Sequence, residues 1–401
     1  MAFPPVIVFD DGKGLLAPLR DARPVFDVRT GAFTTLERME RTVRAVGAGA
    51  EFSVFVPEEL AGVARSQHAR VNTLEKGAGP VLVLNGRGPV VPEDASRLGE
   101  GSALVDTESG DVIAAHLDAA DALVLLGGDR PDMEEIGVSG LHLMTRPWHV
   151  RSMRDRCLGV DLALLARDVP HEIRDREGVL HIGKEPPRVH GTARVSHGAV
   201  FNTESGPVVI DERAVIRPRA LITGPAYVGP GSTVLEQANV KAGTAIGPHC
   251  KVAGEVSGTI FQGYSNKAHD GFLGDSWVGS WVNIGASTVG SNLLNTYGEV
   301  KAEAEPGAGR EGTGEQFFGC VLGDHVKTAI GTRIMTGAVV QTGAMWASHE
   351  PVKGCVDRFA WVTDDTRERF AWEKFEEVMR AAMGRRKMEP GDALVERLGV
   401  L

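Results

Sequence analysis

The stretch that decides the fold covers residues 210–252 and reads IDERAVIRPRALITGPAYVGPGSTVLEQANVKAGTAIGPHCKV. Every sixth residue in it is a β-branched aliphatic: Ile210, Ile216, Ile222, Val228, Val234, Val240, Ile246 and Val252. Small side chains follow at four residues after most of them: Ala214, Ala220, Ala226, Ser232, Ala238, Thr244 and Cys250. A period of six is typical of a solenoid in which three short strands make one triangular coil of about 18 residues. The stretch therefore predicts a left-handed parallel β-helix of hexapeptide repeats.

We expect this β-helix to occupy residues 176–363, with its repeats clearest from Val189 to Trp346. The period slips near Gly254, and we predict that the inward positions resume as Ile260, Asn266, Phe272, Val278 and Ile284. After Asn292 the repeat is lost through LLNTYGEVKAEAEPGAGREGTGEQ, which indicates a loop that leaves the coil. The repeat returns as Leu322, Thr328, Ile334 and Val340.

The C-terminal segment, residues 364–401, is predicted to be helical. Its sequence RERFAWEKFEEVMRAAMGRRK places five apolar residues near one helix face: Phe370, Trp372, Phe375, Val378 and Met379. We expect this helix to pack on the end or the side of the solenoid and to cover its open edge. Its trailing Arg385, Arg386 and Lys387 are either a solvated helix end or a patch for phosphate.

Residues 1–175 have a different pattern, which predicts an α/β domain. The apolar runs VIVFDD, FSVFVP, VLVLNG and ALVLL are interpreted as strands, and FTTLERMERTVRAV as a helix between two of them. Strands that alternate with helices favour a largely parallel sheet. Ligands of such sheets lie beyond the carboxyl ends of the strands, so the loop DDGKGLLAPLRDARP is the expected place for phosphate binding.

Composition limits the partners that we expect. The formal net charge of −10 argues against binding to nucleic acid or to an anionic membrane surface. The sequence has no apolar stretch long enough to span a membrane and no signal-peptide pattern, so we expect a cytoplasmic protein. The four cysteines, Cys157, Cys250, Cys320 and Cys355, are widely spaced and are expected to be reduced thiols.

Three strings carry a resemblance to a known family: LLAPLRDARPVFDV, GYSNKAHDGFLGDSWVGSWVNIGASTVGSNL and FFGCVLGDHVKT. Together they resemble the bacterial GlmU-like family, and more its divergent branch than its best-known bifunctional members. The resemblance implies a nucleotidyltransferase-like α/β domain joined to a β-helix acetyltransferase, in a homotrimer. It also implies acetyl transfer from acetyl-CoA to the amine of glucosamine-1-phosphate, followed by uridylyl transfer that gives UDP-N-acetylglucosamine. The nucleotide partner of this chain would be UTP or another NTP.

The same resemblance implies roles for residues of the solenoid. The family's general-base histidine falls on His269, its sugar-contacting asparagine on Asn283, its CoA-contacting alanine on Ala286, and a second asparagine on Asn292. Lys267 lies one position away from a basic residue of the family pattern. Phe272 replaces the family tyrosine that points at the acyl oxygen, so that contact is not expected here.

The residue types also suit the chemistry without the resemblance. A sugar ammonium must lose a proton before it attacks a thioester, and a histidine that titrates near neutral pH is a natural base. Asp270 could orient the imidazole if the chain turned sharply there. The alternative is that His269 is a structural residue at a coil corner.

Further residues near these motifs are candidate ligand contacts. We assign Tyr264 and His325 to the substrate, although a structural role for His325 stays open. Lys327 and Thr328 could hold a phosphate of CoA or its pantetheine amide, and a solvated lysine at a corner is the alternative.

The N-terminal domain departs from the usual nucleotidyltransferase pattern. Lys13, Arg20, Arg23 and Arg87 are candidates for binding a sugar phosphate or nucleotide, yet Val25 replaces a lysine after Pro24 and Arg87 replaces a metal-binding aspartate. Arginine cannot bind Mg²⁺, so a metal site would need other carboxylates, such as those of Asp10, Asp11 and Asp106. Either this domain binds ligand with altered chemistry, or it is kept for the architecture of the trimer.

Three functions are therefore compatible with the sequence. The first is a trimeric acetyl-CoA-dependent acyltransferase that acts on an amino-sugar phosphate, with or without an active nucleotidyltransferase domain. The second is a non-catalytic trimeric scaffold that binds a nucleotide sugar. The third is nucleotidyl transfer alone, with a β-helix that only organises the oligomer.

Overall fold

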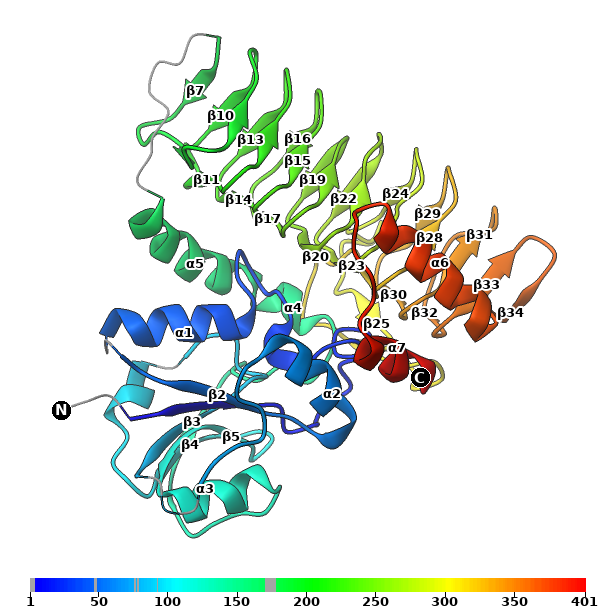
Figure 1. The fold of residues 1–401 in the computed structure, drawn as a ribbon. Helices are drawn as coiled ribbons and strands as arrows, with labels where there is room; N and C mark the ends of the chain where they lie inside the picture. Colours follow the sequence, from blue (N-terminus) through cyan, green and yellow to red (C-terminus); the bar gives the residue numbers. More distant parts are fainter. Residues whose placement is uncertain (1–3, 47–48, 76, 78, 92, 170–177) are drawn as a thin grey trace.

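The computed structural model describes residues 4–46, 49–75, 77, 79–91, 93–169 and 178–401. It consists of an N-terminal α/β domain and a long C-terminal β-solenoid that lies beside it (Figure 1). The two parts are joined through α4 (His149–Ser152) and α5 (Arg154–Asp168). In the described part of the chain, no helix is both long enough and apolar enough to cross a membrane.

The N-terminal sheet has six strands in the order β2-β1-β3-β5-β4-β6. Their bounds are β1 Val6–Phe9, β2 Phe52–Phe55, β3 Val81–Asn85, β4 Ser102–Asp106, β5 Val112–Leu117 and β6 Glu134–Val138. The sheet is mixed, because β5 runs antiparallel to both β3 and β4, whereas the sequence predicted a largely parallel sheet. The helices of this domain are α1 Thr35–Val46, α2 Glu58–Gln67 and α3 Ala119–Leu126, with short 3₁₀ turns at Val25–Asp27 and Glu93–Arg97.

The prediction of a strand at ALVLL was wrong, because residues 122–126 belong to helix α3. A short apolar run does not distinguish a buried strand from a helix. The local signal for a helix is Asp118, whose carboxylate accepts hydrogen bonds from the N–H groups of Ala120 and Asp121 and so caps the first turn. The strand predictions for VIVF, FSVF and VLVLN, and the helix prediction for α1, are confirmed.

The solenoid has three long faces, each a parallel sheet. The first solenoid sheet contains β7 Leu180–Ile182, β10 Val200–Asn202, β13 Leu221–Thr223, β16 Asn239–Val240, β19 Glu255–Ser257 and β22 Phe272–Gly274. The second contains β8 Arg188–Val189, β11 Val208–Ile210, β14 Ala226–Val228, β17 Thr244–Ile246, β20 Ile260–Gly263, β23 Trp277–Ser280, β27 Cys320–Leu322, β30 Ala338–Val340 and β32 Cys355–Val356.

The third solenoid sheet consists of two runs of strands, which Asn283 joins through single bridges to Asn266 and Lys327. It contains β9 Arg194–Val195, β12 Val215–Ile216, β15 Thr233–Val234, β18 Lys251–Val252 and β21 Asn266–Lys267, then β28 Lys327–Thr328, β31 Met345–Ala347, β33 Ala360–Thr363 and the antiparallel β34 Arg367–Arg369. Short strands β24 Val289–Gly290 and β29 Arg333–Ile334 complete the coils. This architecture confirms the predicted left-handed parallel β-helix.

The aliphatic column that set the prediction fills the solenoid interior. All eight residues from Ile210 to Val252 at the six-residue period are fully buried, as are Leu322, Ile334 and Val340 further along. The corner residues Ala214, Ala220, Ala226, Ser232, Ala238, Thr244 and Cys250 are buried too, because only a small side chain fits where the coil turns. The core therefore stacks one aliphatic residue on the next along the whole solenoid.

The predicted positions after the slip at Gly254 were wrong by one residue. The inward side chains there are Phe261, Lys267 and Leu273, rather than Ile260, Asn266 and Phe272. The coil at this point is shorter, since Val240 pairs with Val256 and Val252 with Lys267. Val278 and Ile284 face inward as predicted.

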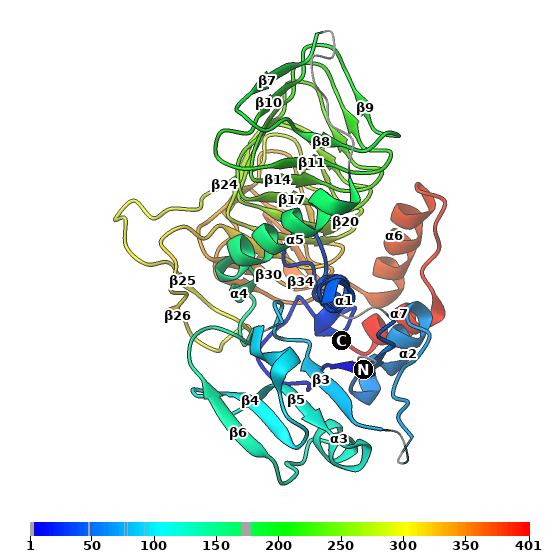
Figure 2. The same ribbon diagram turned by 90° about the vertical axis from the view of Figure 1, so that its left-hand side faces the viewer.

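A long excursion interrupts the solenoid between β23 and β27, as the sequence predicted. Residues 293–318 leave the coil and form a small antiparallel hairpin of β25 (Lys301–Ala302) and β26 (Glu311–Gly312). Figure 2 shows this hairpin projecting from one side of the solenoid, near α4 and the N-terminal domain. Its Glu311 and Glu315 pair with Arg146 and Arg151 of the segment that leads out of that domain.

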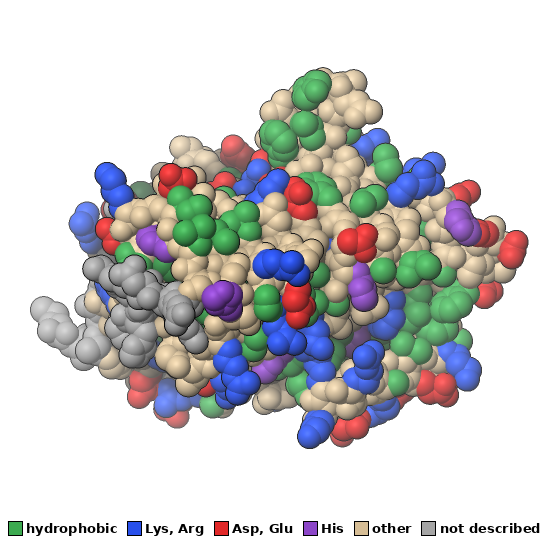
Figure 3. Space-filling model, turned by 90° about the horizontal axis from the view of Figure 1, so that it is seen from above, with side chains coloured by type: hydrophobic (Ala, Val, Ile, Leu, Met, Phe, Trp, Pro, Cys, Tyr) green, Lys and Arg blue, Asp and Glu red, His purple; other side chains and the backbone are tan. Residues whose placement is uncertain are grey.

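The C-terminal segment ends in two helices, α6 (Trp372–Gly384) and α7 (Asp392–Gly399). Helix α6 lies along the side of the solenoid (Figure 2), with Phe375, Met379 and Met383 buried against Phe359 and Met345 of the last coils. The predicted C-terminal helix is thus confirmed, with Trp372, Phe375, Val378 and Met379 in one apolar cluster. Its predicted start was wrong, because Arg367–Arg369 form strand β34 and Phe370 precedes the helix. On the face of the molecule shown in Figure 3, Lys and Arg side chains are interspersed with carboxylates.

The outer surface of the second solenoid sheet is buried under the N-terminal part of the chain. Tyr227, Trp277 and Val321 face outward from this sheet and form one apolar cluster with residues of α5, such as Leu158 and Leu162. Trp277 also donates a hydrogen bond from its indole Nε1 to the carbonyl of Arg29, at 3.0 Å. The α/β domain and the solenoid therefore share a packed interface.

Candidate functional site

A pocket of about 290 Å³ lies between the third solenoid sheet and the end of α6; we call it the basic pocket. Its floor is a row of outward-facing side chains from four coils: Lys251, Asn266, Asn283 and Lys327. They are neighbours because Lys251 pairs with Asn266, Asn266 with Asn283, and Asn283 with Lys327 across the sheet. Ala382, Arg385 and Arg386 from the end of α6 line the opposite side.

A column of rings, which we call the aromatic column, runs along the solenoid beside the basic pocket, and two of its members, Tyr264 and Trp281, line that pocket. His249, Tyr264, Trp281 and His325 occupy the same corner in successive coils, all with φ between 56° and 62°. Neighbouring ring centroids lie 5.0, 4.7 and 6.4 Å apart along this column. Arg386 lies 5.9 Å above both Tyr264 and Trp281, and donates hydrogen bonds to the carbonyl of His249 and to Asn266 Oδ1. These contacts hold the end of α6 against the solenoid.

Lys327 faces this pocket, and its neighbour Thr328 does not. Burial lowers the pKa of Lys327 to about 8, and its Nζ donates to the carbonyl of His325 at 3.2 Å. Thr328 is buried, and its hydroxyl accepts a hydrogen bond from the N–H of Gly285 at 3.0 Å. Of this pair, only Lys327 is therefore placed to contact a ligand in the pocket.

His269 is exposed at the corner that follows the floor residue Asn266. The equivalent corner positions on the next two coils are Ala286 and Ile330, and Ile330 is 80% exposed. Asp270 does not orient the imidazole, because its two carboxylate oxygens accept hydrogen bonds from the N–H and the hydroxyl of Ser287. His269 and Ala286 thus share an open corner next to the basic pocket.

Lys267 is placed inside the coil instead of at a ligand site. Its side chain is 1% exposed, and its Nζ donates to the carbonyls of Ala253, His269 and Asp270 at 2.9, 3.0 and 3.2 Å. Burial lowers its pKa to about 8, and the charge of Asp270 opposes that shift. In this structure Lys267 supports the corner that carries His269 and does not face a pocket, contrary to its predicted contact with substrate.

Asn292 and His325 lie away from the basic pocket. Asn292 donates to Asp275 Oδ2 at 2.8 Å, and the same carboxylate binds Arg151 and Arg154 of the helices that leave the N-terminal domain. His325 lies at the far side of Trp281, next to an interdomain cavity of about 570 Å³ that Arg23 and Arg29 also line. The structure therefore brings Tyr264, Asn283 and Lys327 together, with His269 and Ala286 alongside, and separates the other predicted residues.

His325 is fully buried, and within the described residues its Nδ1 has no hydrogen-bond partner. Burial, with the charges of Lys327 and Arg23, holds its pKa well below the usual value for histidine, so the ring is neutral at pH 7. The adjacent Asp324 forms an ion pair of 2.5 Å with Arg23 of the N-terminal domain. These residues join the two domains beside the aromatic column.

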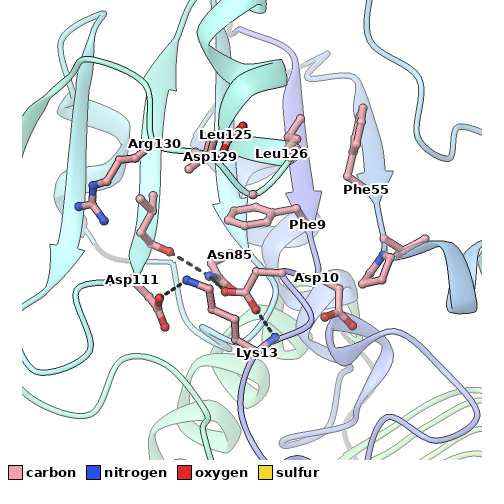
Figure 4. A pocket seen from close by; sticks show the side chains of 16 residues that line it. Phe9, Asp10, Lys13, Phe55, Asn85, Asp111, Leu125, Leu126, Asp129 and Arg130 are labelled. Atoms are coloured by element: carbon pink, nitrogen blue, oxygen red, sulfur yellow. Dashed lines mark hydrogen bonds and ion pairs between the residues drawn. The ribbon is translucent and has the colours of Figure 1, made fainter.

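A second pocket, of about 370 Å³, lies at the carboxyl ends of β1 and β3 in the N-terminal domain (Figure 4). This is where the sequence predicted a phosphate site. Lys13 Nζ lies 2.5 Å from Asp111, and Arg87 Nη2 lies 2.6 Å from Asp11 and 2.5 Å from Asp111. Arg20 pairs with Asp10 at 3.3 Å, and Arg23 pairs with Asp324 outside this pocket. All four predicted phosphate-binding cations are thus paired with carboxylates.

These residues do not fit a Mg²⁺ site. The guanidinium of Arg87 lies between the carboxylates of Asp11 and Asp111, where a metal ion would need them as ligands. Burial opposes the charge of Arg87, but the two carboxylates outweigh it and raise the arginine pKa. Asp106, the third candidate, accepts hydrogen bonds from Glu108 and Ser109 within its own turn. Across the described ranges, no three His, Cys, Asp or Glu side chains are arranged to hold a metal ion.

The sequence did not identify Lys251, Asn266 or Trp281 as residues of the basic pocket. It identified Arg385 and Arg386 as either a solvated helix end or a phosphate patch, without placing them at this pocket. The floor residues are separated by 15, 17 and 44 positions along the chain, so no fixed period connects them. The available signal was a polar residue at the same outward position of each coil. The shift of one residue in the predicted register hid it by assigning Asn266 to the interior.

The comparisons with known proteins fall on both halves of the chain. The sugar nucleotidyl transferase family matches residues 6–169. The bifunctional protein GlmU of Gloeobacter violaceus is 32% identical over 111 residues, which cover 27% of this chain and 24% of that protein. GlmU of Corynebacterium glutamicum is 29% identical over 266 residues, which cover 65% of this chain and 48% of that protein.

Over the matched residues, the chain is similar to the GlmU proteins. It spans about half or less of the length of these curated relatives. Among solved structures, a hexapeptide transferase family protein from Anaplasma phagocytophilum is 14% identical with a TM-score of 0.22, covering 56% of this chain and 97% of that protein.

Proposed function

We propose that the protein is an acetyl-CoA-dependent N-acetyltransferase that acts on a sugar phosphate and is joined to a nucleotidyltransferase-like domain. The proposal places it in the biosynthesis of nucleotide sugars, which the match of residues 6–169 to the sugar nucleotidyl transferase family supports. Glucosamine-1-phosphate is the first acceptor to test, and a homotrimer is the expected assembly. The observation that carries the proposal is the exposed corner of His269 and Ala286, three residues along from the floor of the basic pocket.

In the proposed reaction, His269 removes a proton from the ammonium group of the bound amino sugar. The free amine attacks the thioester carbonyl of acetyl-CoA, which forms the C–N bond of the amide. The C–S bond then breaks, the nitrogen of the new amide releases its second proton to solvent, and the CoA thiolate takes up the proton that His269 holds. Polar N–H groups near the thioester would stabilise the oxyanion of the tetrahedral intermediate. The exposed imidazole of His269 is accessible for such a proton transfer.

The second candidate is nucleotide-sugar binding by the N-terminal domain, with or without nucleotidyl transfer. The match to the sugar nucleotidyl transferase family and the pocket at the carboxyl ends of β1 and β3 favour it. The position of Arg87 argues against metal-assisted transfer, because the carboxylates that would bind Mg²⁺ are paired with its guanidinium. A protein that only binds nucleotide sugar would make the solenoid a scaffold.

A pair of assays on purified protein separates these candidates. The first incubates the protein with acetyl-CoA and glucosamine-1-phosphate, and measures released CoA thiol and the N-acetylated sugar. The second incubates it with UTP, N-acetylglucosamine-1-phosphate and Mg²⁺, and measures pyrophosphate. We expect product only in the first assay. Pyrophosphate release without acetyl transfer would instead support a nucleotidyltransferase whose β-helix organises the oligomer.

A further inference from the structure

The basic pocket concentrates positive charge without any carboxylate. Among its nine lining residues are Lys251, Lys327, Arg385 and Arg386, and none is Asp or Glu. Within the described residues, no carboxylate oxygen lies within 4.0 Å of a charged nitrogen of these four side chains. In the N-terminal pocket, by contrast, Lys13 and Arg87 are paired with aspartates. The basic pocket is therefore the stronger candidate for an anion.

Partial burial also makes the unpaired charges of this pocket energetically unfavourable. Lys327 and Arg386 are both half-buried, and burial disfavours the charged form of each side chain. Buried cations are normally paired, so an anionic ligand would supply the missing partner. The amides of Asn266 and Asn283 lie on the floor between the two lysines and add neutral hydrogen-bond donors.

Two parts of the chain build this pocket together. Lys251 and Lys327 come from the solenoid sheet, whereas Arg385 and Arg386 come from the end of α6. Arg386 is fixed by its hydrogen bond of 2.9 Å to Asn266 Oδ1, so it positions the helix end over the floor. Arg385 is exposed, and within the described residues its side chain makes no hydrogen bond, which leaves its guanidinium available to a ligand. The pocket is complete only when α6 is docked.

We infer that the basic pocket binds a phosphate-bearing ligand, with Lys251, Lys327 and Arg385 contacting phosphoryl oxygens and Arg386 closing the site. Lysine and arginine form charge-assisted hydrogen bonds with phosphate, and clustered cations suit a group that carries more than one negative charge. The phosphoryl group belongs either to CoA or to a phosphorylated sugar. The inference rests on the proposed function for the choice of these two sources, although phosphate binding itself does not depend on it.

Titration calorimetry in phosphate-free buffer tests this inference. The probes are inorganic pyrophosphate, CoA, CoA without its 3′-phosphate, and glucosamine-1-phosphate. The variants Lys251→Gln and Arg385→Gln each remove one charge from an exposed side chain of the pocket. Lys387→Gln is the matched control, because it removes one exposed charge two residues further along without lining the pocket.

We expect each pocket variant to weaken binding of at least one probe by about tenfold, and the control to change it by less than about twofold. A loss confined to glucosamine-1-phosphate would identify the sugar phosphate as the source. A loss for CoA that persists without the 3′-phosphate would identify the diphosphate of CoA, and a loss that disappears with that group would identify the 3′-phosphate. Binding of no probe, or equal effects of pocket and control variants, would overturn the inference.

The outcome is separable from that of the proposed function. Acetyl transfer by a protein whose ligands bind independently of Lys251 and Arg385 would refute this site and leave the acetyltransferase. Phosphate binding that depends on these residues, in a protein that never consumes acetyl-CoA, would retain the site and refute the acetyltransferase.

Discussion

At the scale of single residues, one buried histidine ring has an Nδ1 atom without a hydrogen-bond partner among the residues that the structure describes. His325 is stacked below Trp281 and contacts Phe375 edge-on, with ring centroids 6.4 and 5.8 Å apart. Its pKa lies well below the usual value because the ring is buried near Lys327 and Arg23. His325 therefore acts as a neutral aromatic ring. It holds the same corner position as Tyr264 and Trp281 on the two preceding coils.

This environment predicts how stability depends on pH. The folded state keeps His325 neutral, whereas the unfolded chain protonates it below about pH 6.5. The unfolded state then binds more protons, so His325 lowers stability as pH falls, by at most about 1.4 kcal/mol per pH unit. We predict that His325→Phe reduces the loss of thermal stability between about pH 7.5 and about pH 5.5.

Comparison of wild type with His325→Phe isolates this residue from His149, whose pKa is also lowered, and from His68, whose pKa is raised beside Asp27. Phenylalanine suits the site because three neighbours in the aromatic column and its continuation, Tyr264, Trp281 and Phe359, are aromatic residues with positive φ. Equal losses in both proteins would show that His325 titrates as it does in the unfolded chain.

Lys327 gives a second prediction at this scale, for ligand binding. With a pKa of about 8, it is charged below that value and neutral above it. A phosphate ligand in the basic pocket should therefore bind more weakly as pH rises from about 7 to about 9. The other charged groups that face Lys327 there are Lys251, Arg385 and Arg386.

The measurement is the affinity for pyrophosphate across that range, in wild type and in Lys327→Arg. The arginine variant should retain binding and lose most of the pH dependence, because arginine stays charged. The same pH dependence in both proteins would mean that another group, such as the ligand itself, causes it.

At the scale of elements, helix α6 depends on a small apolar cluster. Phe375 is fully buried and contacts Phe359, Trp372 and His325, with ring centroids 4.8, 5.7 and 5.8 Å apart. Replacing Phe375 with alanine should cost about 3–5 kcal/mol. We predict that α6 then detaches from the solenoid and becomes sensitive to protease, while the solenoid keeps its strand content by circular dichroism.

The control for this prediction is Glu377→Ala, which alters an exposed side chain of the same helix. The variant with alanine at Phe375 should also lose phosphate binding, because Arg385 and Arg386 leave the pocket with the helix end. A protease-resistant α6 in Phe375→Ala would contradict the proposed dependence.

The elements also show how far the sequence could go. A column of one residue type at a fixed spacing of six predicted the solenoid, because its interior admits one aliphatic side chain per strand. The coil near Gly254 is shorter than the others by two residues or more. The prediction that continued the six-residue period through this coil therefore assigned Asn266 to the interior and Lys267 to the outer surface, which is the reverse of the structure. The helical conformation of ALVLL in α3 depends on the cap at its first turn, and the antiparallel direction of β5 depends on its pairing with β3. An apolar run in the sequence indicates neither.

The same limit applies to the candidate site. The sequence could identify Tyr264, Asn283 and Lys327 separately, and the structure places them around one pocket. It could not predict that α6 completes this pocket, because the contact of Arg386 with Asn266 joins residues 120 positions apart. Nor could it show that Lys13 and Arg87 are paired with aspartates from a distant turn.

At the scale of the whole molecule, buried ion pairs join the α/β domain and its exit helices to the solenoid. Asp275 accepts hydrogen bonds from Arg151, Arg154 and Asn292 at 3.0, 2.7 and 2.8 Å. Removing its charge would take away the carboxylate that the half-buried Arg151 and the buried Arg154 share, and would leave them only their pairs with Glu315 and Asp155. We predict that Asp275→Asn destabilises the protein by about 3–5 kcal/mol, measured by chemical denaturation.

A matched control is Glu311→Gln, which breaks the exposed pair with Arg146 at another contact between the domain exit and the hairpin. Such a pair contributes about 0–1 kcal/mol, so the control should be close to wild type. Equal effects of the two substitutions would show that Asp275 is not a buried link between the two parts.

The proposed function requires the solenoid to transfer an acetyl group with His269 as the base. The most direct measurement is the rate of acetyl transfer to glucosamine-1-phosphate by wild type, His269→Ala and His197→Ala. His197 is another exposed histidine at a solenoid corner and serves as the control. We predict that only His269→Ala loses activity, by about 10²–10⁴-fold, with an unchanged affinity for CoA. Full activity in His269→Ala would contradict the claim.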